Sequence, residues 1–79
     1  MYYTYITQSR RDKSFYTGVT ADLKKRIAQH NAGSTPYSSS KRPYKIVWYC
    51  AFSDKQKAYQ FEKYLKSGSG FAFARKRLV

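Results

Sequence analysis

The stretch from Tyr3 to His30 constrains the fold most, because two strand patterns are followed at once by a helix pattern. Residues 2–7 and 14–19 are rich in aromatic and β-branched side chains, which favour β-strands. The polar residues 8–13 between them suit a hairpin loop. Gly18, near the end of the second strand, leaves room for another group to approach closely. The amino-terminal part of the chain is therefore predicted to be a β-hairpin that leads into a helix.

The helix expected after the hairpin has recognisable ends. Thr20 is placed to be its N-cap, and Asp22 would lie in the first turn, where the helix dipole favours negative charge. Asn31 and Gly33 are typical of a helix C-terminus. Residues 32–43 have the composition of a loop, and their length and basic end suggest a surface that touches a ligand.

The clearest strand pattern lies in the second half of the chain, between Tyr44 and Phe52. Strict alternation would place Ile46, Trp48, Cys50 and Phe52 on one face, and the other face is also largely apolar. A strand that is apolar on both faces is expected to be covered on both sides.

A second helix pattern follows this strand. Ser53 and Gln56 have the spacing of a capping box at its start, and Gly68 is expected to end it. Residues 71–78 can then form a short final helix.

Together these elements predict one α+β domain over residues 1–79. Three mainly antiparallel strands would be flanked by helices in the order β-β-α-β-α, with a further short helix possible at the C-terminus. A chain of 79 residues buries a modest share of its surface, so its core must be thin. Nine Tyr, five Phe and one Trp supply large apolar areas with few rotatable bonds for that core.

Charge is the strongest global feature of the chain. Sixteen Lys and Arg against four Asp and Glu give a formal net charge of +12, which predicts a polyanionic partner, most simply nucleic acid. A membrane partner is disfavoured, because no segment reads as a bilayer span or as a strongly amphipathic basic helix. Charge alone leaves a nuclease, a nucleic-acid binder and a ribosomal-type protein open. The residues expected to contact the nucleic acid outside the chemistry are Gly18, Lys24, Lys25, Lys41, Arg42, Arg75, Lys76 and Arg77.

Cys50 is the only cysteine, so neither an intramolecular disulfide nor a zinc cluster can be built. A reducing compartment fits this usage, and the N-terminus lacks the apolar core of a signal peptide, so a cytoplasmic location is expected.

Glu62 is the acidic residue without an evident local role. Asp12 lies in a predicted turn, Asp22 in the first turn of a helix and Asp54 just after a cap, so each has a sufficient structural reason. Glu62 borders the buried face of its helix, one turn after Ala58. By itself this position favours an ion pair with a nearby Lys or Arg.

Four short motifs occur in order along the chain: Tyr3-Thr4-Tyr5, Tyr16-Thr17-Gly18, a helical segment at 23–31 with Arg26 and His30, and Phe61-Glu62-Lys63. In this order they resemble the motifs of the GIY-YIG nuclease superfamily, specifically of its small single-domain members. The resemblance covers nearly the whole chain, although Tyr3 stands where the family more often has Gly.

The resemblance implies roles for five residues that would otherwise read as ordinary core or surface side chains. Glu62 would hold Mg²⁺ or Mn²⁺, for which one carboxylate suffices because Mg²⁺ takes its other ligands from water and phosphate. Arg26 would bind the scissile phosphate and stabilise its developing charge. Tyr5 or Tyr16 would deprotonate the attacking water or attack directly, once nearby positive charge lowers the phenol pKa. His30 would assist proton transfer or orient the phosphate.

The leading hypothesis is therefore a metal-dependent endonuclease that hydrolyses DNA phosphodiester bonds, with DNA repair as its expected setting. RNA stays open as a substrate, and a protein partner or a homodimer is compatible with the sequence. The alternative is a basic nucleic-acid-binding protein with little or no catalysis.

Overall fold

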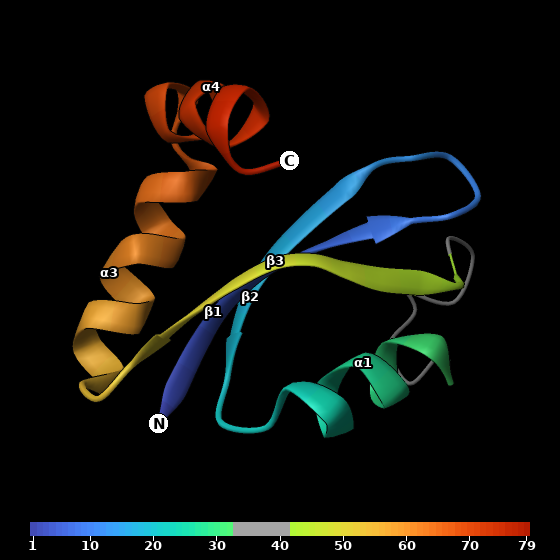
Figure 1. The fold of residues 1–79 in the computed structure, drawn as a ribbon, viewed down its shortest axis with the longest axis horizontal. Helices are drawn as coiled ribbons and strands as arrows, with labels where there is room; N and C mark the ends of the chain where they lie inside the picture. The colour runs from blue at the N-terminus through green and yellow to red at the C-terminus, as the bar shows by residue number, and fades with distance from the viewer. Residues whose placement is uncertain (33–41) are drawn as a thin grey trace.

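The element order β-β-α-β-α-α confirms the predicted α+β class (Figure 1). The structure is a computed structural model that describes residues 1–32 and 42–79, so most of the predicted loop, including Gly33 and Lys41, lies outside the described residues. Within the described residues, no helix combines the length and the apolar character needed to cross a membrane. The strands are β1 (Tyr2–Ser9), β2 (Phe15–Thr20) and β3 (Tyr44–Phe52), and the helices are α1 (Leu23–Asn31), α3 (Lys55–Lys66) and α4 (Gly68–Arg77).

β1 is the central strand of an antiparallel sheet with the order β2-β1-β3. Its middle residues, from Thr4 to Thr7, are all buried. The hydroxyl of Thr4 donates a 2.7 Å hydrogen bond to the backbone oxygen of Ala58, which satisfies a polar group deep in the structure. β3 is an edge strand, and Tyr49 on it is 56% exposed, so the prediction that this strand is covered on both sides is wrong.

The two faces of the sheet carry different helices (Figure 1). Residues paired across an antiparallel ladder share a face. On one face, Tyr5 and Tyr16 meet His30 of α1. On the other face, Ile6 packs in the main apolar cluster with Leu65 of α3 and Ala74 of α4. The sheet therefore separates α1 from the α3–α4 pair.

The predicted strict alternation of side chains along β3 is wrong, because the strand contains a β-bulge. Ile6 pairs with Trp48 whereas Thr7 pairs with Ile46, so Val47 is an extra residue. The insertion turns Ile46 toward the α1 side, while the Trp48 ring packs 5.8 Å from that of Phe61 on α3. Ile46 and Trp48 therefore lie on opposite faces, because one extra residue reverses the period-2 pattern.

Two predicted N-caps are wrong by a short step along the chain. Asp22, rather than Thr20, caps α1 by accepting a 3.0 Å hydrogen bond from the Lys25 amide. Asp54, rather than Ser53, caps α3 by accepting a 2.8 Å hydrogen bond from the Gln56 amide. In both cases a carboxylate, which interacts more strongly with the helix dipole, replaces the nearby hydroxyl.

The turn between α3 and α4 depends on a glycine. Ser67 ends α3 and also caps α4, so Gly68 begins the last helix instead of ending the previous one. Gly70 is buried, and a Cβ atom at this position would overlap the backbone oxygen of Tyr64. α4 can therefore lie against the end of α3 only with glycine at position 70.

We expect Gly70→Ala to lower the free energy of unfolding by about 1–3 kcal/mol, the usual cost of forcing a methyl group into a packed site. Gly68→Ala is the matched control, because nothing lies within 4 Å of a Cβ atom there and alanine is the better helix former. Urea unfolding of both variants measures the difference. Equal stabilities would contradict the close packing of α3 on α4.

Candidate active site

Tyr5 lies at the centre of the predicted site, opposite Gly18 in the β1–β2 pair. It is 1% exposed, and its ring crosses the space above Gly18. A Cβ atom at position 18 would lie 2.5 Å from the Tyr5 hydroxyl oxygen. The close approach predicted at Gly18 is therefore made by the phenol of Tyr5, and contact of Gly18 with nucleic acid stays a prediction.

Arg26 of α1 is joined to Tyr5. Its Nε donates a 3.0 Å hydrogen bond to the Tyr5 hydroxyl oxygen. This hydrogen bond is the main cause that raises the pKa of Arg26, and a further hydrogen bond to Tyr16 acts in the same direction. The guanidinium therefore remains charged and is held between two phenols.

His30 closes the same cluster one helical turn later. Its Nε2 lies 3.4 Å from the Tyr5 hydroxyl oxygen, and its ring centroid lies 5.1 Å from that of Tyr16. Burial, with the charge of Arg26 as a second cause, lowers the pKa of His30 below its ordinary 6.5. Because Arg26 can only donate to Tyr5, the single phenolic proton is available for His30 Nε2. His30 is thus a neutral neighbour of Tyr5 near pH 7.

The expected effect of positive charge on the phenols is wrong for Tyr5. Burial raises the pKa of the Tyr5 hydroxyl above its ordinary value near 10, and the hydrogen bond and charge of Arg26 only partly offset this. Desolvation of a phenolate inside the sheet–helix contact outweighs one cation that is itself partly solvated. Tyr5 therefore stays protonated at neutral pH.

Tyr16 occupies a more open position than Tyr5. It is half-buried on the edge strand β2, where it pairs with Thr7. The ammonium of Lys66 on α3 lies 5.8 Å from the centre of its ring. Tyr16 therefore contacts His30 of α1 and also approaches Lys66 of α3 at the β2 edge of the sheet.

Glu62 reaches this region from α3. Its carboxylate forms an ion pair with Lys66 at 3.3 Å, and its side chain is 20% exposed. Its charge is among the causes that raise the pKa of Tyr5. Since Lys66 lies beside both Glu62 and Tyr16, the carboxylate lies toward the β2 edge of the sheet, where Tyr16 is. The ion pair expected from the sequence is therefore present, and the meeting of Glu62 with the two phenols and Arg26 in one site stays a prediction.

The donor set near Glu62 fits a hard divalent cation held mainly by its substrate. The described residues contain no group of three or more His, Cys, Asp or Glu side chains that could enclose a metal ion. One accessible carboxylate matches Mg²⁺, which retains waters and phosphate oxygens as ligands. Glu62 is the residue that would hold such an ion.

Comparisons with known proteins agree with this arrangement of motifs. Residues 1–76 match the model of the GIY-YIG catalytic domain. The chain belongs to the GIY-YIG family. It is 40% identical over 65 residues to a UPF0213 protein of Streptococcus pyogenes serotype M5, covering 81% of this chain and 70% of that one. It is 39% identical over 66 residues to a UPF0213 protein of Lacticaseibacillus paracasei, covering 82% and 73%.

A solved structure of another UPF0213 protein shares the fold. The solution NMR structure of this protein from Bacillus halodurans superimposes with a TM-score of 0.58 at 30% sequence identity. The match covers 99% of this chain and 87% of that one. Membership of the GIY-YIG family associates the chain with nuclease-type catalytic domains and with a nucleic-acid substrate.

In the described part of this GIY-YIG domain, the basic residues predicted to contact nucleic acid outside the chemistry fall into two groups. Lys24 and Lys25 are exposed on α1, and Arg42 is exposed just before β3. The second group, at the end of α4, lies on the other side of the sheet and consists of Arg75, Lys76 and Arg77. Lys41 lies outside the described residues. The site at the β2 edge therefore has positive charge on both sides.

Sequence reasoning missed the part played by Lys66. Its position four residues after Glu62 is the spacing of a helical ion pair, and this was the available signal. Its second contact, with the Tyr16 ring, comes from another element and depends on how α3 packs on the sheet.

We expect this GIY-YIG domain to lose stability as the pH falls below the unfolded-state pKa of His30, near 6.5. Above that pH the imidazole is neutral in both states. Below it the unfolded chain binds a proton that the folded chain, with its lowered His30 pKa, does not bind until lower pH. The midpoint temperature of thermal unfolding, measured at several pH values between about 7.5 and 5.5, gives the slope of stability against pH. His30→Gln should flatten it, and an equal slope in both proteins would contradict a buried, neutral His30.

Proposed function

We propose that the chain is a metal-dependent endonuclease that hydrolyses phosphodiester bonds in DNA. The observation that supports this most directly is the contact of Arg26 with both Tyr5 and Tyr16, with the charge of the Glu62 carboxylate near enough to influence the pKa of Tyr5. A cytoplasmic location and a role in DNA repair stay predictions.

Arg26 is the residue we assign to the scissile phosphate. Its Nε is committed to Tyr5, which fixes the plane of the guanidinium. A guanidinium has five N–H donors, so the terminal nitrogens retain donors for phosphate oxygens after the bond to Tyr16. A fixed cation that faces the growing charge needs little reorganisation during the reaction.

The two phenols differ in accessibility, and this divides their roles. Tyr5 is buried with a raised pKa, so it remains a protonated support for Arg26. Tyr16 is half-buried and has cations on two sides, so it is the phenol that can meet a water molecule. In the reaction, water attacks phosphorus and the bond to the leaving oxygen breaks. The Tyr16 hydroxyl accepts the proton of the attacking water while it passes its own proton to solvent, and the leaving oxygen takes up a proton from solvent. His30 holds the Tyr5–Tyr16 packing by filling the space behind both rings.

Glu62 is the residue that would hold a divalent cation. When bound, the ion supplies positive charge at the phosphate and its leaving oxygen. With a single metal, Arg26 must carry part of the charge stabilisation that a second ion provides in two-metal nucleases.

A second candidate function is a nucleic-acid-binding protein that cuts poorly or not at all. The ion pair between Glu62 and Lys66 favours it, because a metal must compete with an ammonium that already neutralises the carboxylate. The net charge of +12 serves both functions equally.

We expect Glu62→Gln and Arg26→Lys each to reduce metal-dependent cleavage of labelled DNA by about 100-fold or more. The first removes the carboxylate charge, and the second keeps the positive charge but loses the planar fork of donors. Asp12→Asn is the control, since it removes an equal charge in the β1–β2 turn, where Asp12 accepts a hydrogen bond from Ser14.

Three readouts decide between the two functions: cleavage with Mg²⁺ or Mn²⁺, DNA affinity in EDTA, and thermal unfolding. Loss of cutting with affinity and folding retained supports the enzyme. Equal background cutting by all four proteins would reject it in favour of the binding protein.

A further inference from the structure

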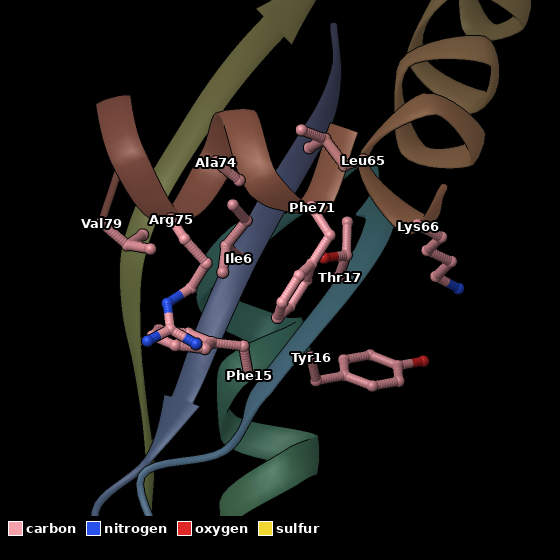
Figure 2. A pocket seen from close by; sticks show the side chains of 10 residues that line it. All are labelled: Ile6, Phe15, Tyr16, Thr17, Leu65, Lys66, Phe71, Ala74, Arg75 and Val79. Carbon is pink, nitrogen blue, oxygen red and sulfur yellow. The ribbon is translucent and has the colours of Figure 1, made fainter. Parts of the chain in front are cut away.

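Apart from the candidate active site, the structure contains a pocket on the face of the sheet opposite Arg26 and His30. It is a pocket of about 430 Å³, within the range of about 300–1,000 Å³ usual for small-molecule sites. Ile6, Phe15 and Thr17 of the sheet line one side, and Phe71 and Ala74 of α4 line the other. Figure 2 shows the Phe71 and Arg75 side chains extending from α4 toward Phe15 and Thr17 of the sheet.

The lining of this pocket combines aromatic rings with cations. The guanidinium carbon of Arg75 lies 5.4 Å from the ring centre of Phe15 and 5.8 Å from that of Phe71. Phe71 is 49% exposed although it is a large apolar side chain. Lys66 also lines the pocket, and none of the described residues that line it has a carboxylate side chain. A ligand that suits this lining has a flat, aromatic part and an anionic part.

The pocket shares two residues, Tyr16 and Lys66, with the proposed active site. Tyr16 lines the pocket and also packs on His30 on the opposite face. Lys66 lines the pocket and also pairs with Glu62. Figure 2 shows Tyr16 at one end of the pocket and Val79 at the other. A group bound in this pocket would therefore lie close to a phosphate held at Tyr16.

We propose that this pocket binds an unpaired nucleobase of the substrate strand, adjacent to the phosphate that is cut. The proposal rests on the proposed nuclease function, and it narrows the substrate to nucleic acid that has an unpaired nucleotide at the cleavage position. A base inside an intact duplex is stacked and paired, so it can reach a side-chain pocket only from a single strand or after leaving the helix. The exposed ring of Phe71 and the planar Arg75 supply the stacking surfaces, and Arg75 and Lys66 supply charge for the neighbouring phosphates.

Binding of DNA that contains one 2-aminopurine tests this proposal in EDTA, where cleavage does not intervene. Three probes share one sequence: a single strand, a perfect duplex, and a duplex in which the 2-aminopurine is bulged. We expect a fluorescence change at the 2-aminopurine for the single strand or the bulge, and none for the perfect duplex. A response from the single strand alone indicates that the pocket takes a base that is already unpaired, whereas a response from the bulged duplex indicates that it also takes a base next to a double helix.

Phe71→Ala should weaken binding of the responsive probe about tenfold, equivalent to ~1.4 kcal/mol, as is usual for loss of one base–aromatic stack. Phe73→Ala is the matched control, because Phe73 is also on α4, is 41% exposed and packs on Tyr64 away from the pocket lining. Phe71→Leu retains the apolar volume if the alanine variant is unstable, and it should still lose the fluorescence change.

Equal effects of the Phe71 and Phe73 substitutions, or an equal response from the perfect duplex, would overturn the pocket assignment. Failure of the nuclease proposal looks different. In that case none of the proteins cuts DNA with metal, while the fluorescence change at the unpaired base and its loss in Phe71→Ala persist.

Discussion

The phenol of Tyr5 lies where a side chain at position 18 would otherwise be, and the geometry of the site depends on this contact. Without a Cβ atom on Gly18, the ring can cross the β1–β2 ladder and bring its hydroxyl to Arg26. Arg26 is then held by a group on the sheet rather than by solvent. The lack of a side chain at Gly18 therefore allows Tyr5 of the hairpin to bind Arg26 of α1 and to fix the orientation of its guanidinium.

Burial and charge act in opposite directions in this contact, and burial is the stronger. Arg26 would stabilise a phenolate, yet the desolvation of Tyr5 raises the pKa of its hydroxyl. Burial also lowers the pKa of His30, so two neighbours of Arg26 on this face, Tyr5 and His30, are neutral at pH 7. The guanidinium therefore keeps its charge available for an external anion. The proposed acid–base step is therefore assigned to Tyr16, which lies on the edge strand β2.

Much of the fold could be predicted from local patterns, because strand composition and helix stop signals are short-range properties. The class and the element order follow from these patterns, and the meeting of Tyr5, Arg26 and His30 was implied by the resemblance of the motifs to the GIY-YIG family. The bulge at Val47 could not be predicted, since it arises from the pairing of β3 with a strand far away in sequence. The caps at Asp22 and Asp54 were missed because a hydroxyl and a carboxylate stood next to each other as alternatives.

The pKa shifts and charge contacts of the site could not be predicted from the sequence for a different reason. A pKa depends on how far a group is removed from water, and the sequence does not reveal which of many tyrosines is covered. The contact of Lys66 with both Glu62 and Tyr16 likewise depends on how α3 crosses the sheet.

In the proposed active site, a divalent cation held by Glu62 and a substrate phosphate meet the phenol of Tyr16 at the β2 edge of the sheet. Paramagnetic line broadening by Mn²⁺ measures this directly in ¹⁵N-labelled protein bound to a cleavage-resistant phosphorothioate DNA strand. The account predicts that the amide signals of Glu62, Tyr16 and Gly18 broaden first, while those of Asp12 and Asp54 stay sharp. Broadening centred on Asp12 or Asp54, with Glu62 unaffected, would contradict it.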